Sequence, residues 1–168
     1  MMNLFFLLSS LASASDVTAQ NWKTHPEITE IRMLRKSIER NVVEPTWTTK
    51  KENLSTCAAN RVSKRSLILD NNGTVRRYKA HGTDNGTSFW TTQYYGPTGK
   101  LRFVQLKLTH VDSNSTADYT SFLDIHGQRL FEHVQRTTDD QKLHPSGIPE
   151  DMLMFRPDQV VKKKYPCG

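Results

Sequence analysis

The sequence predicts an α+β fold in which one N-terminal amphipathic helix packs on an antiparallel β-meander of about six strands. Three observations support this fold class. Residues 24–44 carry an apolar stripe at helical spacing, three similar glycine-containing turns recur, and the links between them are short and polar. Strands joined in this way pair in sequence order. The 168 residues fit one domain, since domains commonly run to about 100–200 residues. The pattern leaves open how strongly the sheet curves.

The beginning of the chain predicts a secretory signal peptide. Residues 4–11 form a short, mostly apolar run, and small residues follow it. The run is too short to span a bilayer, which takes roughly 20 apolar residues, and no later segment is apolar enough to do so. Cleavage after Ala14 or Ala19 fits the small-residue rule, and the second site is preferred. Residues 1–19 are then the signal peptide and residues 20–168 a single exported domain, periplasmic or extracellular. An apolar N-terminal strand is the alternative.

The helix is expected over residues 25–44. Thr24 and Glu27 have the spacing of a capping box, and Pro26 stands in the first turn, where its missing N–H costs nothing. Pro45 ends the helix. The residues that recur at intervals of three and four form one stripe, which is expected to pack on the domain: Ile28, Ile31, Leu34, Ile38 and Val42.

After a short strand or loop in residues 46–66, the chain becomes a series of β-hairpins. Three segments share one pattern: LDNNGTVRRY (69–78), YGPTGKLRFV (95–104) and LDIHGQRLFE (123–132). Their glycines supply the positive φ angle that a type I turn followed by a β-bulge requires: Gly73, Gly99 and Gly127. Three hairpins are therefore expected, over residues 66–79, 89–109 and 119–136.

In the strand expected after Gly99, the apolar residues change from odd to even positions partway along. Leu101 and Phe103 have one parity and are expected on one face. The later apolar residues have the opposite parity: Val104, Leu106 and Leu108. A β-bulge near Phe103, or a strand buried on both faces, explains the change.

The final stretch, residues 137–168, is expected to wrap the sheet. It contains four prolines and one short helix near residues 150–155. Because exported thiols tend to pair, Cys57 and Cys167 predict a disulfide that fastens this stretch. The bridge closes a loop of about 110 residues and contributes on the order of 4–5 kcal/mol on the chain-entropy model. Two independent thiols are the alternative.

The helix segment HPEITEIRMLRKSIE, a cysteine after it, and hairpins of the type YYGPTGKLRFV and FLDIHGQRLFE resemble a set of uncharacterised exported bacterial proteins of this size. The resemblance covers most of the chain after the leader and implies an N-terminal helix followed by repeated hairpins. No activity or site residue follows from it. Because these are bacterial proteins, the Asn-x-Ser/Thr sequons are interpreted as turn residues: Asn53, Asn72, Asn85 and Asn114.

The net charge indicates anionic partners. The whole chain carries +6, and removal of residues 1–19 takes away only Asp16 and leaves +7. Such an excess attracts an anionic polymer or an acidic envelope protein over a long range. The candidate binding residues are basic and aromatic side chains of the hairpins: Tyr94, Tyr95, Lys100, Arg102, Lys107, Arg76 and Arg77. Lys100 and Arg102 are expected on one face with Tyr94 or Gln93. A solvated basic face above an aromatic core is the alternative.

The sequence contains no recognisable catalytic or metal-binding motif. Its six histidines lack the spacing of known zinc motifs, although His110, His126 and His133 fall on neighbouring hairpins, where a cross-strand cluster can form. Asp70 and Asp124 start turns, where such side chains bond the turn's own backbone. A second pair of carboxylates, Asp139 and Asp140, follows the last hairpin. No metal, cofactor or sequence-specific nucleic acid is expected.

These features favour a non-enzymatic binding or inhibitor-like module of the cell envelope that acts through a basic sheet face. The inhibitor-like version depends on analogy between folds. Two alternatives stay open. One is a hydrolase whose histidines and carboxylates converge only in three dimensions, and the other is a structural accessory protein with no small-molecule site.

The disulfide can be tested on the exported protein. We expect its mass to rise by that of two hydrogen atoms when it is reduced, because each sulfur of a disulfide takes up one proton and one electron. Mass spectrometry with and without reductant measures this. An unchanged mass would refute the pairing of Cys57 with Cys167.

Overall fold

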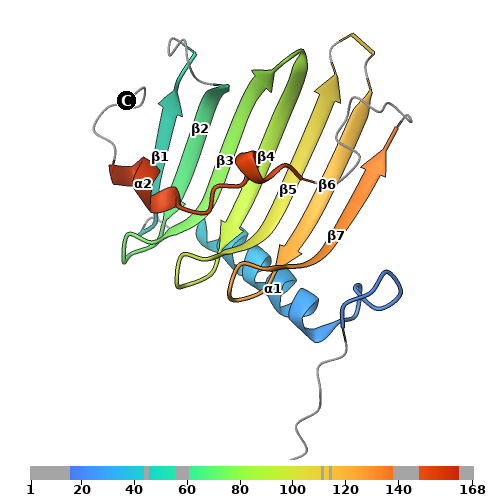
Figure 1. Ribbon diagram of the computed structural model, residues 1–168. Coiled ribbons are helices and arrows are strands. Elements are labelled where there is room, and N and C mark those ends of the chain that lie inside the picture. The colour runs from blue at the N-terminus through green and yellow to red at the C-terminus, as the bar shows by residue number, and fades with distance from the viewer. Residues whose placement is uncertain are drawn as a thin grey trace, which may run out of the picture.

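The computed structural model describes residues 16–43, 46–55, 61–110, 112–113, 115–137 and 148–162. They form one antiparallel sheet in which every strand pairs with the next along the chain (Figure 1). The sheet is not closed, so that β1 and β7 are its edges. The elements are α1 Pro26–Asn41, β1 Thr48–Asn53, β2 Val62–Leu69, β3 Val75–Asp84, β4 Thr87–Tyr95, β5 Leu101–His110, β6 Thr116–Leu123, β7 Arg129–Arg136, the 3-10 helix η1 Glu150–Met152 and α2 Pro157–Lys162.

The predicted meander and its three hairpins are confirmed, but the sheet has seven strands rather than six. The additional strand is β1, which comes from the segment whose pattern left strand and loop open. It pairs with β2 over its whole length, from Thr48 opposite Leu69 to Asn53 opposite Lys64. Its sequence, TTKKEN, contains no apolar residue and none of its side chains is buried. Such an edge strand shows no alternation that a sequence pattern can reveal.

The three repeated turns have the same backbone hydrogen bonds. Between β2 and β3, the Gly73 N–H donates to the Asp70 carbonyl at 2.9 Å, and the Asp70 N–H donates to the Thr74 carbonyl at 3.0 Å. The other two turns repeat both bonds, and all three glycines have φ angles from 74° to 89°. Asp70 Oδ1 accepts two further backbone N–H groups, as does Asp124 Oδ1 in its own turn. The interpretation of these glycines and aspartates as turn residues is confirmed.

A β-bulge follows each of these turns and adds one residue to the second strand. Tyr94 pairs with Phe103 but Tyr95 pairs with Leu101, so that Arg102 has no cross-strand partner. The same irregularity occurs in the β2–β3 and β6–β7 hairpins. The bulge explains the change of parity in β5. It also corrects the expectation that Leu101 and Phe103 share a face, because they lie in different core clusters on opposite faces.

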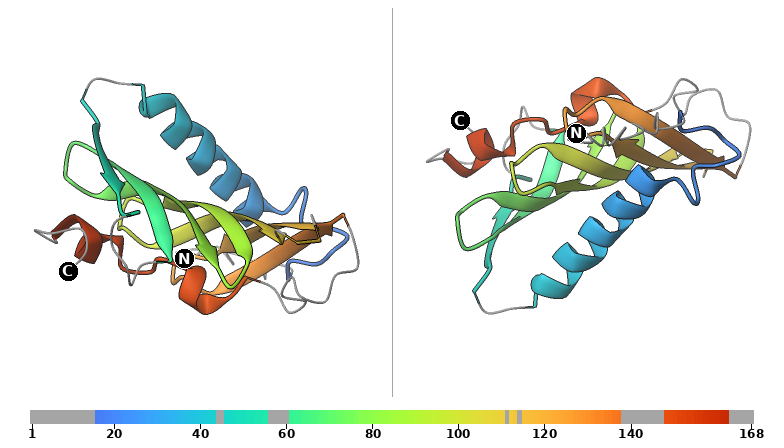
Figure 2. Two further views of the ribbon diagram at one scale, coloured as in Figure 1. Left: turned by 90° about the horizontal axis from the view of Figure 1, so that it is seen from above. Right: turned by 90° about the horizontal axis from the view of Figure 1, so that it is seen from below.

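Different segments cover the two faces of the sheet. Helix α1 lies on one face, called the helix face below, and the C-terminal segment 148–162 lies on the other (Figures 1 and 2). The larger apolar cluster is the one under the C-terminal segment, and it includes Leu67, Tyr95, Leu106, Leu108 and Tyr119. The cluster under α1 consists of buried Ile28, Ile31, Ile38, Tyr94, Phe103 and Phe122.

The predicted helix is confirmed, but its ends differ from those expected. His25 is the N-cap residue and no side chain caps the helix. Thr24 Oγ1 instead donates to the Asn21 carbonyl at 3.3 Å, so the predicted capping box is wrong. The helix ends at Asn41, and Pro45, expected to end it, lies outside the described residues. The predicted apolar stripe is confirmed, with Ile28, Ile31 and Ile38 buried and Leu34 and Val42 packed beside them.

The described part of the C-terminal segment, residues 148–162, crosses the sheet, and a buried glutamine holds it there. The Gln93 side-chain amide donates to the Met152 carbonyl and accepts the Met154 N–H, both at 2.8 Å. The Tyr95 hydroxyl donates to the Met154 carbonyl at 2.8 Å. A buried amide requires such partners, because an unpaired one costs free energy. Both cysteines, and with them the predicted disulfide, lie outside the described residues.

The chain forms a compact turn ahead of α1. The Trp22 N–H donates to the Thr18 carbonyl at 3.0 Å, and the Thr18 N–H donates to Asn21 Oδ1 at 2.8 Å. The indole of Trp22 stacks on an aromatic ring of β7 with ring centroids 5.1 Å apart, and Val17 packs against the same cluster. Residues on both sides of Ala19 therefore contribute to this turn.

This turn makes the position of signal cleavage matter for stability. We expect a chain that begins at Gln20 to be less stable than one that begins at Ser15 by about 1–2 kcal/mol, because it loses the contacts of Val17 and Thr18. Urea unfolding of the two purified chains measures the difference. A chain that begins at Asp16 is the control and should match the longer one. Equal stability of all three chains would contradict a structural role for Val17 and Thr18.

Candidate binding face

Two of the predicted binding residues, Tyr94 and Arg77, dock α1 on the sheet. Both are buried, and both donate to the Glu39 carboxylate of α1, Tyr94 Oη at 2.6 Å and Arg77 Nη1 at 2.7 and 2.8 Å. Burial raises the pKa of Glu39, but the hydrogen bonds from Tyr94 and Arg77 outweigh burial and hold that pKa below the ordinary value. Burial, followed by the hydrogen bond to Glu39, raises the pKa of Tyr94 to about 12. At neutral pH the ionised carboxylate of Glu39 therefore accepts hydrogen bonds from the neutral phenol of Tyr94 and the guanidinium of Arg77.

Three further predicted residues also make contacts within the fold. Tyr95 is fully buried on the opposite face, under the C-terminal segment. Arg102 is buried in its bulge, where it donates to a backbone carbonyl of β6 at 3.1 Å and pairs with Glu30 of α1 at 3.5 Å. Arg76 pairs with Asp70 at 3.1 Å. These side chains hold the bulges, the turns and α1 together.

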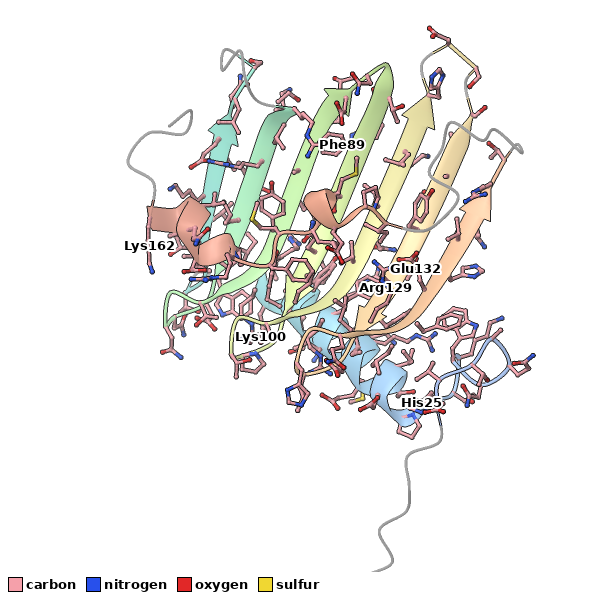
Figure 3. All side chains as sticks on the ribbon, in the orientation of Figure 1. His25, Phe89, Lys100, Arg129, Glu132 and Lys162 are labelled. Carbon is pink, nitrogen blue, oxygen red and sulfur yellow. The ribbon has the colours of Figure 1, made fainter. Side chains whose placement is uncertain are left out.

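The last two predicted residues, Lys100 and Lys107, are exposed but do not lie together. Lys100 stands in the β4–β5 turn at the lower end of the sheet in Figure 3. Lys107 lies further along β5 on the helix face, beyond the residues that α1 covers. Tyr94 and Arg102 share the helix face, as expected, but they lie beneath α1, and Gln93 lies on the other face. The seven predicted residues therefore form no single surface.

Helix α1 packs on one cross-strand row of the helix face, and the rows beyond it stay uncovered by the helix. Strand pairing places Lys51, Ser66, Lys79, Thr92, Gln105, Thr120 and His133 in the first of these rows. It places Asn53, Lys64, His81, Trp90, Lys107, Asp118 and Gln135 in the second. None of these side chains is buried. The two rows together are called the open face below.

The open face carries more cations than carboxylates. Among the described residues, none of its four lysines has a carboxylate within ion-pair distance: Lys51, Lys64, Lys79 and Lys107. Asp118 is the one carboxylate in the two rows. The arginines of the sheet contrast with these lysines, because most of them have an acidic partner: Arg65, Arg76, Arg77, Arg102 and Arg129. Among the described residues, the sheet thus pairs most of its arginines and leaves these four lysines without an ion pair.

A large aromatic side chain stands among these lysines. Trp90 is 47% exposed and belongs to neither core cluster. Its indole stacks on His81, its cross-strand neighbour, with ring centroids 4.5 Å apart and an interplanar angle of 25°. Ser63 Oγ lies 3.4 Å from Nδ1 of the His81 ring. The indole therefore has a stacked neighbour although nearly half of the side chain is exposed.

Two grooves follow the open face. One has a volume of about 710 Å³ and lies over β1 to β4, where Lys51, Lys64, Lys79, His81 and Trp90 line it. The other, of about 530 Å³, lies between α1 and strands β5 and β6. Its lining includes Arg32, Arg35 and Lys36 of α1 and Gln105 and Thr120 of the sheet. The first row of the open face passes through both grooves, which favours an extended ligand that crosses several strands.

The histidines and carboxylates considered for catalysis or metal binding are dispersed. His110 is buried at the end of β5, His126 is exposed in the β6–β7 turn, and His133 stacks on the indole of the N-terminal turn at 5.5 Å. Within the described ranges, no three histidine, cysteine, aspartate or glutamate side chains are grouped to hold a metal ion. Asp139 and Asp140 lie outside those ranges.

Most of the open face is not predicted by the sequence pattern, which indicates Lys107 as a binding residue but not Lys51, Lys64, His81 or Trp90. These residues come from separate strands, and no local motif links them. One signal was present. Asn85 and Gly86 have φ angles of 46° and 75°, as in the two-residue turn that an Asn-Gly pair favours. Counting back from that turn places His81 opposite Trp90. The turn also confirms the interpretation of the Asn85 sequon as a turn residue. For Asn53 the same interpretation is wrong, because Asn53 is the last residue of β1 and pairs with Lys64.

No protein-family model, curated protein or solved structure matches this chain. In the part of the chain that the structure describes, no helix has the length and apolar composition needed to cross a membrane. The function of the protein is therefore inferred from the chemistry of the open face and its surroundings.

The contact of Glu39 with Arg77 and Tyr94 predicts a pH-dependent stability. We expect Glu39→Gln to lower the free energy of unfolding by about 2 kcal/mol at pH 7, because it leaves the buried Arg77 without a counter-ion. This is below the cost of breaking a fully buried pair, since Glu39 is partly exposed. The pKa of Glu39 is lowered by folding, so its contribution is present above the unfolded-state pKa and is lost as the pH falls through the folded-state value. The effect should therefore shrink in acid.

Urea unfolding at neutral and acidic pH measures this difference. Glu30→Gln is the matched control, because it removes the same charge from the same helix. Its pair with Arg102 is long, at 3.5 Å, and the Glu30 side chain is 66% exposed, so the loss should be about 0.5 kcal/mol or less. An equal loss in both variants, or a loss in Glu39→Gln that grows in acid, would contradict the proposed role of Glu39.

Proposed function

We propose that the protein is a non-enzymatic binding module of the cell envelope that holds an anionic polymer on its open face. The observation that carries this proposal is the set of four lysines without ion-pair partners on a face with a single carboxylate. Like charges on one surface repel one another, and an anionic ligand relieves that repulsion. The net charge of +6 adds long-range attraction for such a ligand.

The spread of the lysines favours a polymer over a small anion. Lys64 and Lys107 lie in one row, with β3 and β4 between their strands. Neighbouring strands are about 4.8 Å apart, so these two side chains start roughly 14 Å from each other. A small anion cannot contact both, whereas an extended chain with repeated charges can. The two grooves along α1 and over β1 to β4 provide a path for such a chain.

The predicted export agrees with this function, because cell envelopes contain acidic polymers that a secreted domain meets directly. A signal peptide and a disulfide are part of the proposal. Export places the mature chain in an oxidising compartment, where Cys57 and Cys167 are expected to pair.

Binding through the lysines predicts a strong dependence on salt and on position. We expect the protein to bind dextran sulfate but not uncharged dextran, with an affinity that falls steeply from low to physiological salt, because exposed charges are screened. Lys64→Gln/Lys107→Gln should weaken binding about tenfold at low salt, since each exposed ion pair contributes up to about 1 kcal/mol. Isothermal titration calorimetry measures both effects.

Lys100→Gln/Lys162→Gln is the matched control. It removes the same two charges, but Lys100 stands in the β4–β5 turn and Lys162 ends α2 (Figure 3). Its affinity for dextran sulfate should stay within about twofold of the unsubstituted protein. The proposal fails if dextran sulfate does not bind at low salt, or if the two double variants lose affinity equally.

A further inference from the structure

Trp90 has no structural explanation in the fold. It stands in the second row of the open face between His81 and Lys107, which are its cross-strand partners. Nearly half of the side chain is exposed, and it packs in neither core cluster. Single exposed apolar residues are common on protein surfaces. An exposed indole that is held by a stacked neighbour within a lysine-lined groove is a more specific arrangement.

The geometry leaves one ring face of Trp90 available. His81 covers the indole from β3 by stacking, so the remaining ring face is directed toward β5, where Lys107 is the paired residue. Because the stack and the Ser63 contact to His81 hold the ring in place, a ligand that binds against it loses little side-chain entropy of the protein. The site thus offers a flat apolar platform next to a cation.

The platform is surrounded by neutral polar groups that the fold does not use. Among the described residues, the side chains of Ser66, Thr92, Gln105 and Thr120 make no hydrogen bond to another side chain or to the backbone. All four are half-buried and lie in the first row of the open face. Hydroxyl and amide groups both donate and accept, which matches a ligand with many hydroxyl groups.

We propose that the polymer on the open face is a polysaccharide of uronic acids, and that one of its sugar rings stacks on Trp90. This inference rests on the proposed function and specifies its ligand. A sugar ring presents an apolar face of C–H groups to an indole and directs its hydroxyl groups outward to the polar row. Its carboxylates supply negative charges that can pair with Lys51, Lys64, Lys79 and Lys107.

Two features of the open face favour this polymer over a nucleic acid. The four cations within its two rows are all lysines, and the arginines that line the second groove, Arg32 and Arg35, belong to α1. Arginine is the residue that matches phosphate in a bidentate way and stacks on bases. Single-stranded nucleic acids also bind along several successive aromatic platforms, and the two rows contain one tryptophan and no tyrosine or phenylalanine. A chain with carboxylates at intervals and one stacked ring fits both features.

The experiment compares three probes on the full-length mature protein by calorimetry: a galacturonic acid oligosaccharide, polyaspartate of matched charge, and oligo-dT. We expect the oligosaccharide to bind most tightly. Trp90→Ala should weaken its binding about tenfold or more, as the loss of a stacking platform does for other flat ligands, and should leave polyaspartate binding within about twofold. Trp90→Phe, which keeps a smaller ring, should lose less than Trp90→Ala.

Gln105→Leu is the second variant, and it should weaken binding of the oligosaccharide more than that of polyaspartate, because the sugar offers many hydroxyl groups to the polar row. Thermal unfolding of each variant verifies that it folds. If Trp90→Ala leaves oligosaccharide affinity unchanged, or weakens polyaspartate equally, the sugar-stacking inference is overturned. Tighter binding of oligo-dT overturns it in favour of a nucleic acid. In these cases the proposed function still stands if Lys64→Gln/Lys107→Gln weakens polyanion binding, and it fails separately if that variant does not.

Discussion

The register set by the glycine turns is the constraint on which the whole sheet depends. In each repeated hairpin, a glycine with positive φ and the bulge after it determine which residue of the second strand lies opposite which residue of the first. Side chains alternate with a period of two, so a slip by one residue exchanges the two faces. Such a slip in β5 would turn Leu106 and Leu108 toward solvent and Lys107 into the core. The turns therefore determine which side chains are buried in the core and which are exposed on the open face.

The fold treats its two kinds of cation differently. Most arginines of the sheet have carboxylate partners in the same chain, and Arg77 and Arg102 bridge the sheet to α1 in this way. Lysines of the open face have no such partner among the described residues. The two sides of the sheet differ correspondingly. One side is sealed by the C-terminal segment through Gln93 and Tyr95, and the other is covered by α1 over one row and exposes charged and polar side chains beyond it.

What could be predicted from the sequence was local. The turn glycines, Asp70 and Asp124 act within a few residues of the chain, and the apolar stripe of α1 is a periodicity along one segment. Both kinds of feature can therefore be recognised from the sequence. The capping box failed because a nearer backbone carbonyl, that of Asn21, takes the Thr24 hydroxyl. Most of the proposed binding face could not be predicted in this way, because it is assembled across strands. In the sequence, Lys64 cannot be distinguished from other solvent-exposed lysines, and only strand pairing shows that it lies beside His81. The alternation of the sequence predicts an exposed Arg102, but the β-bulge places it beneath α1.

The three copies of the hairpin have a consequence for how this surface can change over time. Gly73, Gly99 and Gly127 recur at intervals of 26 and 28 residues, and each interval contributes two strands to an open-ended sheet. Duplication or loss of one such unit would lengthen or shorten both rows by two positions without altering which side chains point outward. The middle of the sheet thus consists of repeated two-strand units. Changes in the number of these units at the level of the gene would therefore change the length of the proposed polymer-binding face.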